Sequence, residues 1–183
     1  MLGLMQDDQL TITSLMRHGR SINGDSTIVS ITSDNPRHRY TMRECFDRAA
    51  QLAHALKKLG LEQGQAVGTL AWNDYRHMEA YYGVACMGSV CHTINPRLFP
   101  EQLNYIINHA EDQFILTDPM FVPLIEALEE HLPNVKGYIV MTNKAGMPDT
   151  KLSNVYCYEE LIADESPCYD WPELDENTAC SLC

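Results

Sequence analysis

Apolar runs of strand length alternate with amphipathic stretches of helical length along most of this chain after residue 65. The runs of strand length cover residues 66–72, 89–95, 113–117 and 137–142. Between them, residues 75–87, 100–110 and 123–132 repeat their apolar positions at helical spacing. Strands that alternate with helices in this way predict right-handed crossovers and a mainly parallel sheet. The pattern therefore predicts an α/β fold with helices on both faces of that sheet.

The stretch from Thr41 to Gly60 carries the most complete set of helix signals. Thr41 and Glu44 have the spacing of a capping box, in which the threonine hydroxyl and the glutamate carboxylate each accept from the other's backbone N–H. Apolar residues then recur at helical spacing from Cys45 to Leu59. Gly60 is placed to end the helix, because glycine adopts the left-handed backbone conformation that helix ends require.

The two ends of the chain predict shorter elements. A helix is expected within residues 10–22, beginning at Thr13 or Ser14 and ending before Gly24, with Leu15 and Met16 facing inward. Two short strands are expected at residues 27–32 and 37–40, on either side of a turn at residues 34–36. Toward the other end, the expected elements are a strand at residues 155–158, a helical turn at 158–163, and the start of a strand at 178–183.

Charge and hydropathy narrow the classes of function. The 183 residues contain 13 Lys and Arg against 25 Asp and Glu, a formal net charge of -12. Nonspecific binding to nucleic acid or to an anionic membrane needs a positive surface, so neither is expected. No apolar span of about 20 residues predicts a transmembrane helix, and the first eight residues lack the basic start of a secretory signal. We therefore expect a cytoplasmic protein without nucleic-acid partners.

The seven cysteines are an odd number without the spacing of a disulfide framework, which predicts reduced thiols packed in the core. Cys180 and Cys183 form a C-x-x-C pattern, which in other sequences marks metal or redox sites. Here no second pair accompanies them, and on a strand the two side chains would point to opposite faces. We therefore predict no metal site.

The run Arg17-His18-Gly19 matches the signature of histidine phosphatases, in which the nucleophilic histidine follows the first strand. Residues 10–13 have the composition of such a strand. A three-residue match is weak, however, and no second histidine stands in a matching context. A phosphatase that uses His18 is therefore a remote alternative.

Two further residues carry candidate chemistry. His77 falls within the expected helix at 75–87, and no Cys, Asp or Glu stands at a ligand spacing from it, so a buried structural histidine is the favoured interpretation. Arg97 follows a strand that must end at Asn95-Pro96. Ligands bind at that end of α/β sheets, where a guanidinium can bind a phosphate or carboxylate bidentately. The alternative is an exposed loop charge.

Several runs together resemble the N-terminal part of AMP-forming acyl-CoA synthetases, and most closely the medium- and long-chain fatty-acid-CoA ligases. The matching residues are Tyr40-Thr41 with the helix to Gly60, residues 61–71, Trp72-Asn73 with residues 76–82, residues 88–98 including Asn95-Pro96-Arg97-Leu98, and residues 108–112. The matches occur in the family's order and span nearly the whole chain.

The resemblance implies a two-step reaction that uses ATP, magnesium and CoA. A carboxylic acid, here a fatty acid, reacts with ATP to an acyl-adenylate and pyrophosphate, and CoA then displaces AMP to form a thioester. The family's Ser/Thr/Gly-rich phosphate loop, which ends in Pro-Lys-Gly, does not occur in these residues. We therefore expect an N-terminal fragment that is inactive alone, with no catalytic residue of its own and no tightly held cofactor.

The resemblance also implies roles for single residues and for segments of the chain. Arg97 is similar in position to an arginine that contacts the CoA phosphates, while His92 and Trp72 either line the neighbouring cleft or, as we favour, pack in the core. Residues 1–24 are expected to form a helical segment that helps to build a homodimer, which makes a dimerisation module the alternative function. Residues 25–177 are expected to form the α/β subdomain, and 178–183 the strand that leads toward the phosphate loop.

Overall fold

The computed structural model describes residues 1, 3–32 and 34–183 of the chain. Leu2, which belongs to the predicted N-terminal segment, and Ser33 lie outside the described residues. Within the described residues, no helix has both the length and the apolar character needed to cross a membrane.

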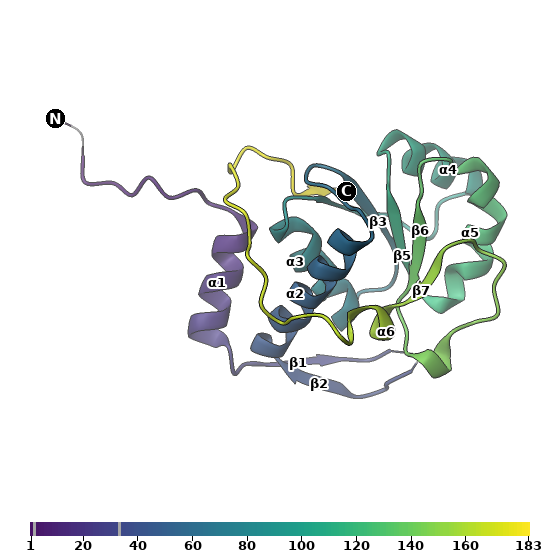
Figure 1. Ribbon diagram of the computed structural model, residues 1–183, viewed down its shortest axis with the longest axis horizontal. Helices are drawn as coiled ribbons and strands as arrows, with labels where there is room; N and C mark the ends of the chain where they lie inside the picture. The colour runs from purple at the N-terminus through teal and green to yellow at the C-terminus, as the bar shows by residue number, and fades with distance from the viewer. Residues whose placement is uncertain (2, 33) are drawn as a thin grey trace.

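A six-stranded parallel sheet forms the centre of the molecule, and helices cover both of its faces (Figure 1). Its strands are β3 (Ala66–Leu70), β4 (Val90–Thr93), β5 (Phe114–Thr117), β6 (Gly137–Val140), β7 (Val155–Cys157) and β8 (Ser181–Leu182), in the order β7-β6-β5-β3-β4-β8. All five pairings are parallel. This confirms the α/β class that the alternation of strands and helices predicted.

Alternate residues of the central strands β3, β5 and β6 contribute to two separate hydrophobic cores. In β5, Phe114 and Leu116 face one core, while Ile115 faces the other. The first core contains residues of α2 (Met42–Lys58), α3 (Tyr75–Cys86) and α6 (Tyr158–Ile162). The second contains residues of α4 (Pro100–His109) and α5 (Val122–Leu128). Burial on both faces explains why the strands read as continuous apolar runs.

The capping box predicted at the start of α2 is present. The backbone N–H of Thr41 donates to Glu44 Oε2 at 2.7 Å, and the N–H of Glu44 donates to Thr41 Oγ1 at 3.2 Å. At the other end, Gly60 has a φ of +91°, the left-handed conformation that ends the helix there. Both local signals in the sequence were therefore interpreted correctly.

A small antiparallel hairpin and one helix precede the sheet. The hairpin consists of β1 (Thr27–Ser30) and β2 (His38–Thr41), and it lies at the bottom of the view in Figure 1. Helix α1 (Ile12–Asn23) lies at the left, and residues 3–9 extend away from the body (Figure 1). The predicted inward face of α1 was half right: Met16 is buried, but Leu15 is 55% exposed. The helical spacing of apolar residues locates an apolar stripe on the helix, but it does not show which residues of that stripe pack against another element.

Candidate site at the carboxyl ends of the strands

Arg97 lies in the loop between β4 and α4, directly beyond the carboxyl end of β4. Its backbone N–H donates to Asn95 Oδ1 at 3.0 Å, and the N–H of Leu98 donates to the Asn95 carbonyl at 3.2 Å, so Asn95 fixes the turn. The side chain of Arg97 is exposed and forms no ion pair with any described residue. It is therefore a cation at the sheet edge that is open to an anionic ligand.

Trp72 follows the end of the neighbouring strand, β3. Since Thr69 pairs with Thr93, Trp72 and Pro96 stand three residues further along two adjacent strand ends. The strand predicted over residues 66–72 ends at Leu70, and the side chain of Trp72 is 45% exposed, so its predicted packing in the core was wrong. The ring turns outward because the chain leaves the sheet before Trp72 and enters the turn toward α3.

Two buried side chains hold the backbone of Trp72 from both sides. Asp118 Oδ2 accepts a hydrogen bond from the Trp72 N–H at 2.7 Å. On the other side, Nδ1 of His77 lies 3.2 Å from the Trp72 carbonyl, and its Nε2 lies 3.0 Å from Thr69 Oγ1. Because a carbonyl only accepts, the imidazole carries its proton on Nδ1. Burial lowers the pKa of His77 and keeps the ring neutral. The interpretation of His77 as a buried structural histidine is confirmed.

Asp118 lies beyond the end of β5 and contributes a carboxylate to a cavity beside Trp72. Burial raises its pKa to about 6, against the lowering effect of the hydrogen bond from Trp72. The cavity has a volume of about 510 Å³ and is lined by Ile31, Thr32, Trp72, Asp74, Asp118, Pro119, Met120 and Met141. A carboxylate, an aromatic ring and a thioether thus meet at the same edge of the sheet as Arg97.

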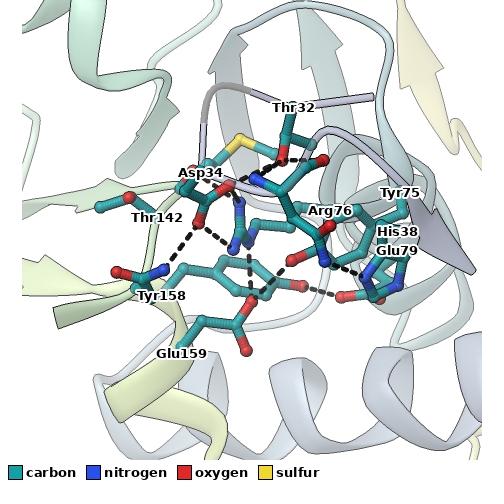
Figure 2. A network of polar contacts seen from close by, with 12 residues as sticks. Thr32, Asp34, His38, Tyr75, Arg76, Glu79, Thr142, Tyr158 and Glu159 are labelled. Carbon is teal, nitrogen blue, oxygen red and sulfur yellow. Dashed lines mark hydrogen bonds and ion pairs between the residues drawn. The ribbon is translucent and has the colours of Figure 1, made fainter. Parts of the chain in front are cut away.

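A network of buried ion pairs ties the hairpin to this edge of the sheet (Figure 2). The guanidinium of Arg76, only 3% exposed, donates to Asp34 Oδ2 and to Glu159 Oε1, both at 2.7 Å. It also donates to the carbonyl of Met141, at the end of β6, at 3.2 Å. Because Met141 lines the cavity and Asp34 holds the loop that carries Thr32, Arg76 sets two of the cavity walls.

A second arginine extends this network between α2, α3 and α6. Arg48 donates from Nε to Glu79 Oε1 at 2.8 Å and forms a bidentate pair with Glu159 at 3.0 Å for each bond. The hydroxyl of Tyr158 donates to the other oxygen of Glu79 at 2.7 Å. Glu79 is fully buried, and its two partners account for both of its oxygens. This part of the network supports the fold rather than a reaction.

His92 of β4 forms another buried pair, on the α4 side of the sheet. Its Nδ1 lies 2.8 Å from Asp112 Oδ2, and Asp112 is fully buried. His92 is 7% exposed, which confirms its predicted packing in the core. The pair lies at the amino end of β5 rather than among the groups beyond the strand ends, so we assign it a structural role.

Several other predictions from the sequence need correction. The helix predicted within residues 10–22 is present as α1, with His18 exposed in its middle, and residues 12 and 13, which the remote phosphatase alternative would place in a strand, belong to the same helix. Cys168 and Cys183 are exposed and Cys180 is partly exposed, so only the other four cysteines are core thiols. Because no strand precedes His18 among the described residues, the remote alternative of a histidine phosphatase is not supported.

The chemistry of this site was only partly visible in the sequence. Arg97 was singled out because a strand had to end before it, but no role was predicted for Asp118. Its signal was available, since a carboxylate directly after a buried parallel strand lies at the ligand-binding end of the sheet. Among the described residues, no group of three or more His, Cys, Asp or Glu side chains could hold a metal ion.

Comparison with known proteins adds information that geometry alone does not give. The family model described as AMP-binding enzyme matches residues 20–176. A medium-chain-fatty-acid-CoA ligase of Ectopseudomonas oleovorans is 43% identical over all 183 residues, which is 34% of that protein. A 3-methylmercaptopropionyl-CoA ligase of Ruegeria lacuscaerulensis has the same identity and coverage. A long-chain-fatty-acid-CoA ligase of Thermus thermophilus is 38% identical over 97% of the chain and 31% of its own length.

Solved structures agree with this fold. The anthranilate CoA ligase AuaEII, in complex with anthranoyl-AMP, superposes with a TM-score of 0.81 at 20% identity, over 97% of this chain and 31% of that protein. At this identity the likeness concerns the fold alone. The chain spans about a third of the length of the curated relatives it matches.

Proposed function

Since this chain belongs to the AMP-binding enzyme family, we propose that it contributes the N-terminal part of an AMP-forming acyl-CoA ligase that acts on a fatty acid or a related carboxylic acid. The observation that carries this proposal is identity of 43% with named CoA ligases along the whole chain. The two relatives at that identity are named for different acids, so the class of acid is proposed only as a carboxylic acid that such ligases activate.

The proposed reaction has two steps. In the first, a carboxylate oxygen of the acid attacks the α-phosphorus of ATP, the bond to the bridging oxygen breaks, and pyrophosphate leaves. In the second, the CoA sulfur attacks the acyl carbon, the bond to the AMP oxygen breaks, and the thiol proton passes to solvent. Magnesium would offset phosphate charge in the first step. The described residues offer no metal site, so we assign no step to it.

In this reaction, Arg97 would contact a phosphate of CoA during the second step. Its support is the exposed guanidinium beyond the carboxyl end of β4, in a turn that Asn95 fixes. A protein with a net charge of -12 repels a polyanion in general, so a local, charge-assisted contact is required to hold one. Arg97 meets that requirement.

The test measures the two half-reactions separately in the longer ligase that carries this chain. Arg97→Ala should reduce thioester formation from preformed acyl-adenylate about tenfold or more, while adenylate formation, followed by ATP-pyrophosphate exchange, stays within about twofold. Arg39→Ala is the matched control, because Arg39 is also exposed but lies on β2, away from the strand ends. Equal loss in both half-reactions would show that Arg97 is structural.

A separate experiment tests the proposal that this chain is only part of a ligase and is inactive alone. The 183 residues contain no Ser/Thr/Gly-rich loop that ends in Pro-Lys-Gly. The purified chain should therefore show no carboxylate-dependent exchange of pyrophosphate into ATP. Exchange above the buffer background would contradict the proposal.

A homodimer is a second proposed property, and it rests on α1 and β1. Leu15 and Ile22 of α1 are 55% and 68% exposed, and Val29 of β1 is 54% exposed. Leu15 and Val29 also line an apolar cavity of about 610 Å³ between these elements and α3. Exposed aliphatic side chains that gather on neighbouring elements favour contact with another protein surface.

A further inference from the structure

Met120 presents an exposed sulfur-containing side chain at the carboxyl edge of the sheet. It lies in the short helix η1 (Pro119–Phe121), directly after Asp118, and it is 64% exposed. It also lines the cavity of about 510 Å³ beside Trp72, so there is free space around its side chain. A thioether that water reaches is open to oxidation, which converts methionine into methionine sulfoxide.

The indole of Trp72 directs a hydrogen-bond donor at this sulfur. Its Nε1–H donates to Met120 Sδ at 3.0 Å. The backbone of Trp72 is held independently, because its N–H donates to Asp118 Oδ2 at 2.7 Å and its carbonyl lies 3.2 Å from Nδ1 of His77. The ring of Phe121 lies 5.5 Å from the indole ring. The donor is therefore in position before any change occurs at the sulfur.

A sulfoxide suits this donor better than a thioether does. Thioether sulfur is a weak acceptor of hydrogen bonds, whereas sulfoxide oxygen is polar and accepts them well. The methionine side chain has three rotatable bonds, and the cavity leaves room for the new oxygen to turn toward Nε1 of Trp72. Oxidation of Met120 should therefore strengthen the contact between η1 and Trp72.

The other methionines lack this combination of exposure and a donor. Those that are buried or partly buried are Met16, Met42, Met78, Met87, Met141 and Met147. Met1 and Met5 are exposed, but no described residue donates a hydrogen bond to either sulfur. Met5 is therefore an internal control for exposure alone.

The oxidation needs a peroxide as its co-reactant. A lone pair of the Met120 sulfur attacks one oxygen of hydrogen peroxide, the O–O bond breaks, and an S–O bond forms. The departing hydroxide takes the proton of the transferred hydroxyl group and leaves as water, so the sulfur is oxidised and the peroxide is reduced. Because the Trp72 N–H occupies one lone pair of the sulfur, the oxidant approaches the other lone pair.

We propose that Met120 is a site of reversible oxidation, at which the indole N–H of Trp72 selects one face of the sulfur and then holds the sulfoxide oxygen. Methionine sulfoxide reductases reverse the change. The sulfoxide fastens η1 to Trp72 and adds a polar oxygen to the cavity wall. The modification is independent of the proposed ligase reaction, because no substrate of that reaction takes part in it.

The first test determines the stereochemistry of the sulfoxide in the 183-residue chain, oxidised with hydrogen peroxide under native conditions. An unrestrained methionine gives both epimers at sulfur, and two classes of reductase each reduce one of them. At Met120, one class should remove at least about fivefold more sulfoxide than the other, as measured by peptide mass spectrometry. At Met5, the two classes should remove about equal amounts.

Trp72→Phe is the matched variant, because it keeps an aromatic ring and removes the indole donor. It should make the two epimers at Met120 about equal and leave the rate of oxidation within about threefold. Equal epimers at Met120 in the wild-type chain, or a preference that persists in Trp72→Phe, would overturn the role of Trp72. Resistance of Met120 under conditions that oxidise Met5 would overturn the site itself.

A second measurement needs no substitution of Trp72. The indole N–H groups of Trp72 and Trp171 give separate NMR signals in a nitrogen-labelled chain, and Trp171→Phe assigns them. Oxidation should move the Trp72 proton signal downfield and slow its exchange with water, while the Trp171 signal stays unchanged. Both effects should disappear after reduction and in Met120→Leu, but persist in Met5→Leu. An unchanged Trp72 signal in a chain whose Met120 is fully oxidised would show that the sulfoxide oxygen is not held.

Discussion

The carboxylate of Asp112 lies directly over Gly68, in the space that a side chain on that residue would fill. A Cβ atom built at Gly68 would lie 2.9 Å from Asp112 Oδ2 and 3.0 Å from Cδ1 of Ile94. Gly68 is therefore required by a close approach within the core, on the central strand β3, rather than by an unusual backbone angle. Its absent side chain makes room for the buried pair of Asp112 with His92.

Gly68→Ala is expected to lower the free energy of unfolding by about 2 to 3 kcal/mol, because the new methyl group must displace a buried, hydrogen-bonded carboxylate. Gly19→Ala is the control: Gly19 lies in α1, where a Cβ would only touch the ring of Phe46 at 3.4 Å. That change should be neutral or stabilise by up to about 1 kcal/mol. Urea titration of both variants measures the difference, and equal values would refute the steric role of Asp112.

The ion pair between Arg48 and Glu79 leads to a second prediction. Glu79 is fully buried, and Arg48 is its only cationic partner among the described residues. Burial raises the pKa of Glu79, and Arg48 opposes that effect. Arg48→Met leaves this carboxylate without a countercharge, so it should cost about 3 to 5 kcal/mol of unfolding free energy.

A surface pair provides the comparison for Arg48. Lys144 and Glu160 lie 2.8 Å apart, but their side chains are 83% and 52% exposed. Lys144→Met removes the same charge and should cost less than about 1 kcal/mol. The two variants are compared by denaturant unfolding at neutral pH. A loss for Arg48→Met as small as that for Lys144→Met would show that water reaches Glu79 in the native state.

The success of the sequence-based predictions depended on the distance over which each signal acts. Helix α2 was predicted closely, because its capping box and its terminal glycine act within a few residues. The network around Arg76 was invisible, because its bonds to Asp34 and Glu159 join residues 42 and 83 positions apart. Periodicity records which residues are apolar, whereas such contacts depend on how the crossovers bring distant elements together.

In the candidate site, too, features set by neighbouring residues were predicted, and contacts between distant residues were not. Arg97 was found from the residues beside it, since Asn-Pro ends the strand and fixes the loop. Trp72 was assigned to a buried strand because its apolar ring continued the run from Ala66. Only the structure shows that β3 ends at Leu70, and that Asp118, 46 residues further on, holds the backbone of Trp72.

Asp34 and Asp118 should change stability with pH in opposite directions. Burial alone would raise the pKa of Asp34, but hydrogen bonds from Arg76 and Thr32 outweigh it and lower the pKa to about 2. A carboxyl titrates near pH 3.9 in an unfolded chain, so Asp34 stabilises the native state above that pH. Its contribution should disappear as the pH falls from about 4 to about 2. Asp34→Asn should remove this loss, which we expect to be about 1 kcal/mol because the pair is partly screened by solvent.

For Asp118, the change of stability with pH has the opposite sign. Its native pKa of about 6 lies above the unfolded value, so the native state holds this proton more tightly between pH 4 and pH 6. Stability should therefore fall as the pH rises through that range, by about 1 kcal/mol after allowance for solvent access. Asp118→Asn should flatten this decline and leave the Asp34 transition unchanged. Unfolding free energies of the wild-type chain, Asp34→Asn and Asp118→Asn, measured from pH 2.5 to 7, test both changes of stability with pH. If stability still declines between pH 4 and pH 6 in Asp118→Asn, the decline belongs to another titrating group.

The exposed face of α1 gives the last prediction. Leu15 and Ile22 are seven residues apart, two helical turns, so they lie on one side of the helix, while Met16 packs into the core. If this side forms the proposed dimer contact, the double variant Leu15→Asp and Ile22→Asp should shift the chain from dimer to monomer in sedimentation equilibrium. It should also leave the unfolding free energy of the monomer within about 0.5 kcal/mol, because both side chains are already exposed.

Ser21 offers the matched control for this prediction. It is exposed on the same helix but points to another side, so Ser21→Asp adds negative charge to α1 without entering the apolar face. The Ser21→Asp chain should remain a dimer at the concentrations at which the double variant of Leu15 and Ile22 is a monomer. A chain that sediments as a monomer before any change, or a double variant that remains dimeric, would remove α1 from the interface, since two buried carboxylates in an apolar contact each cost several kcal/mol.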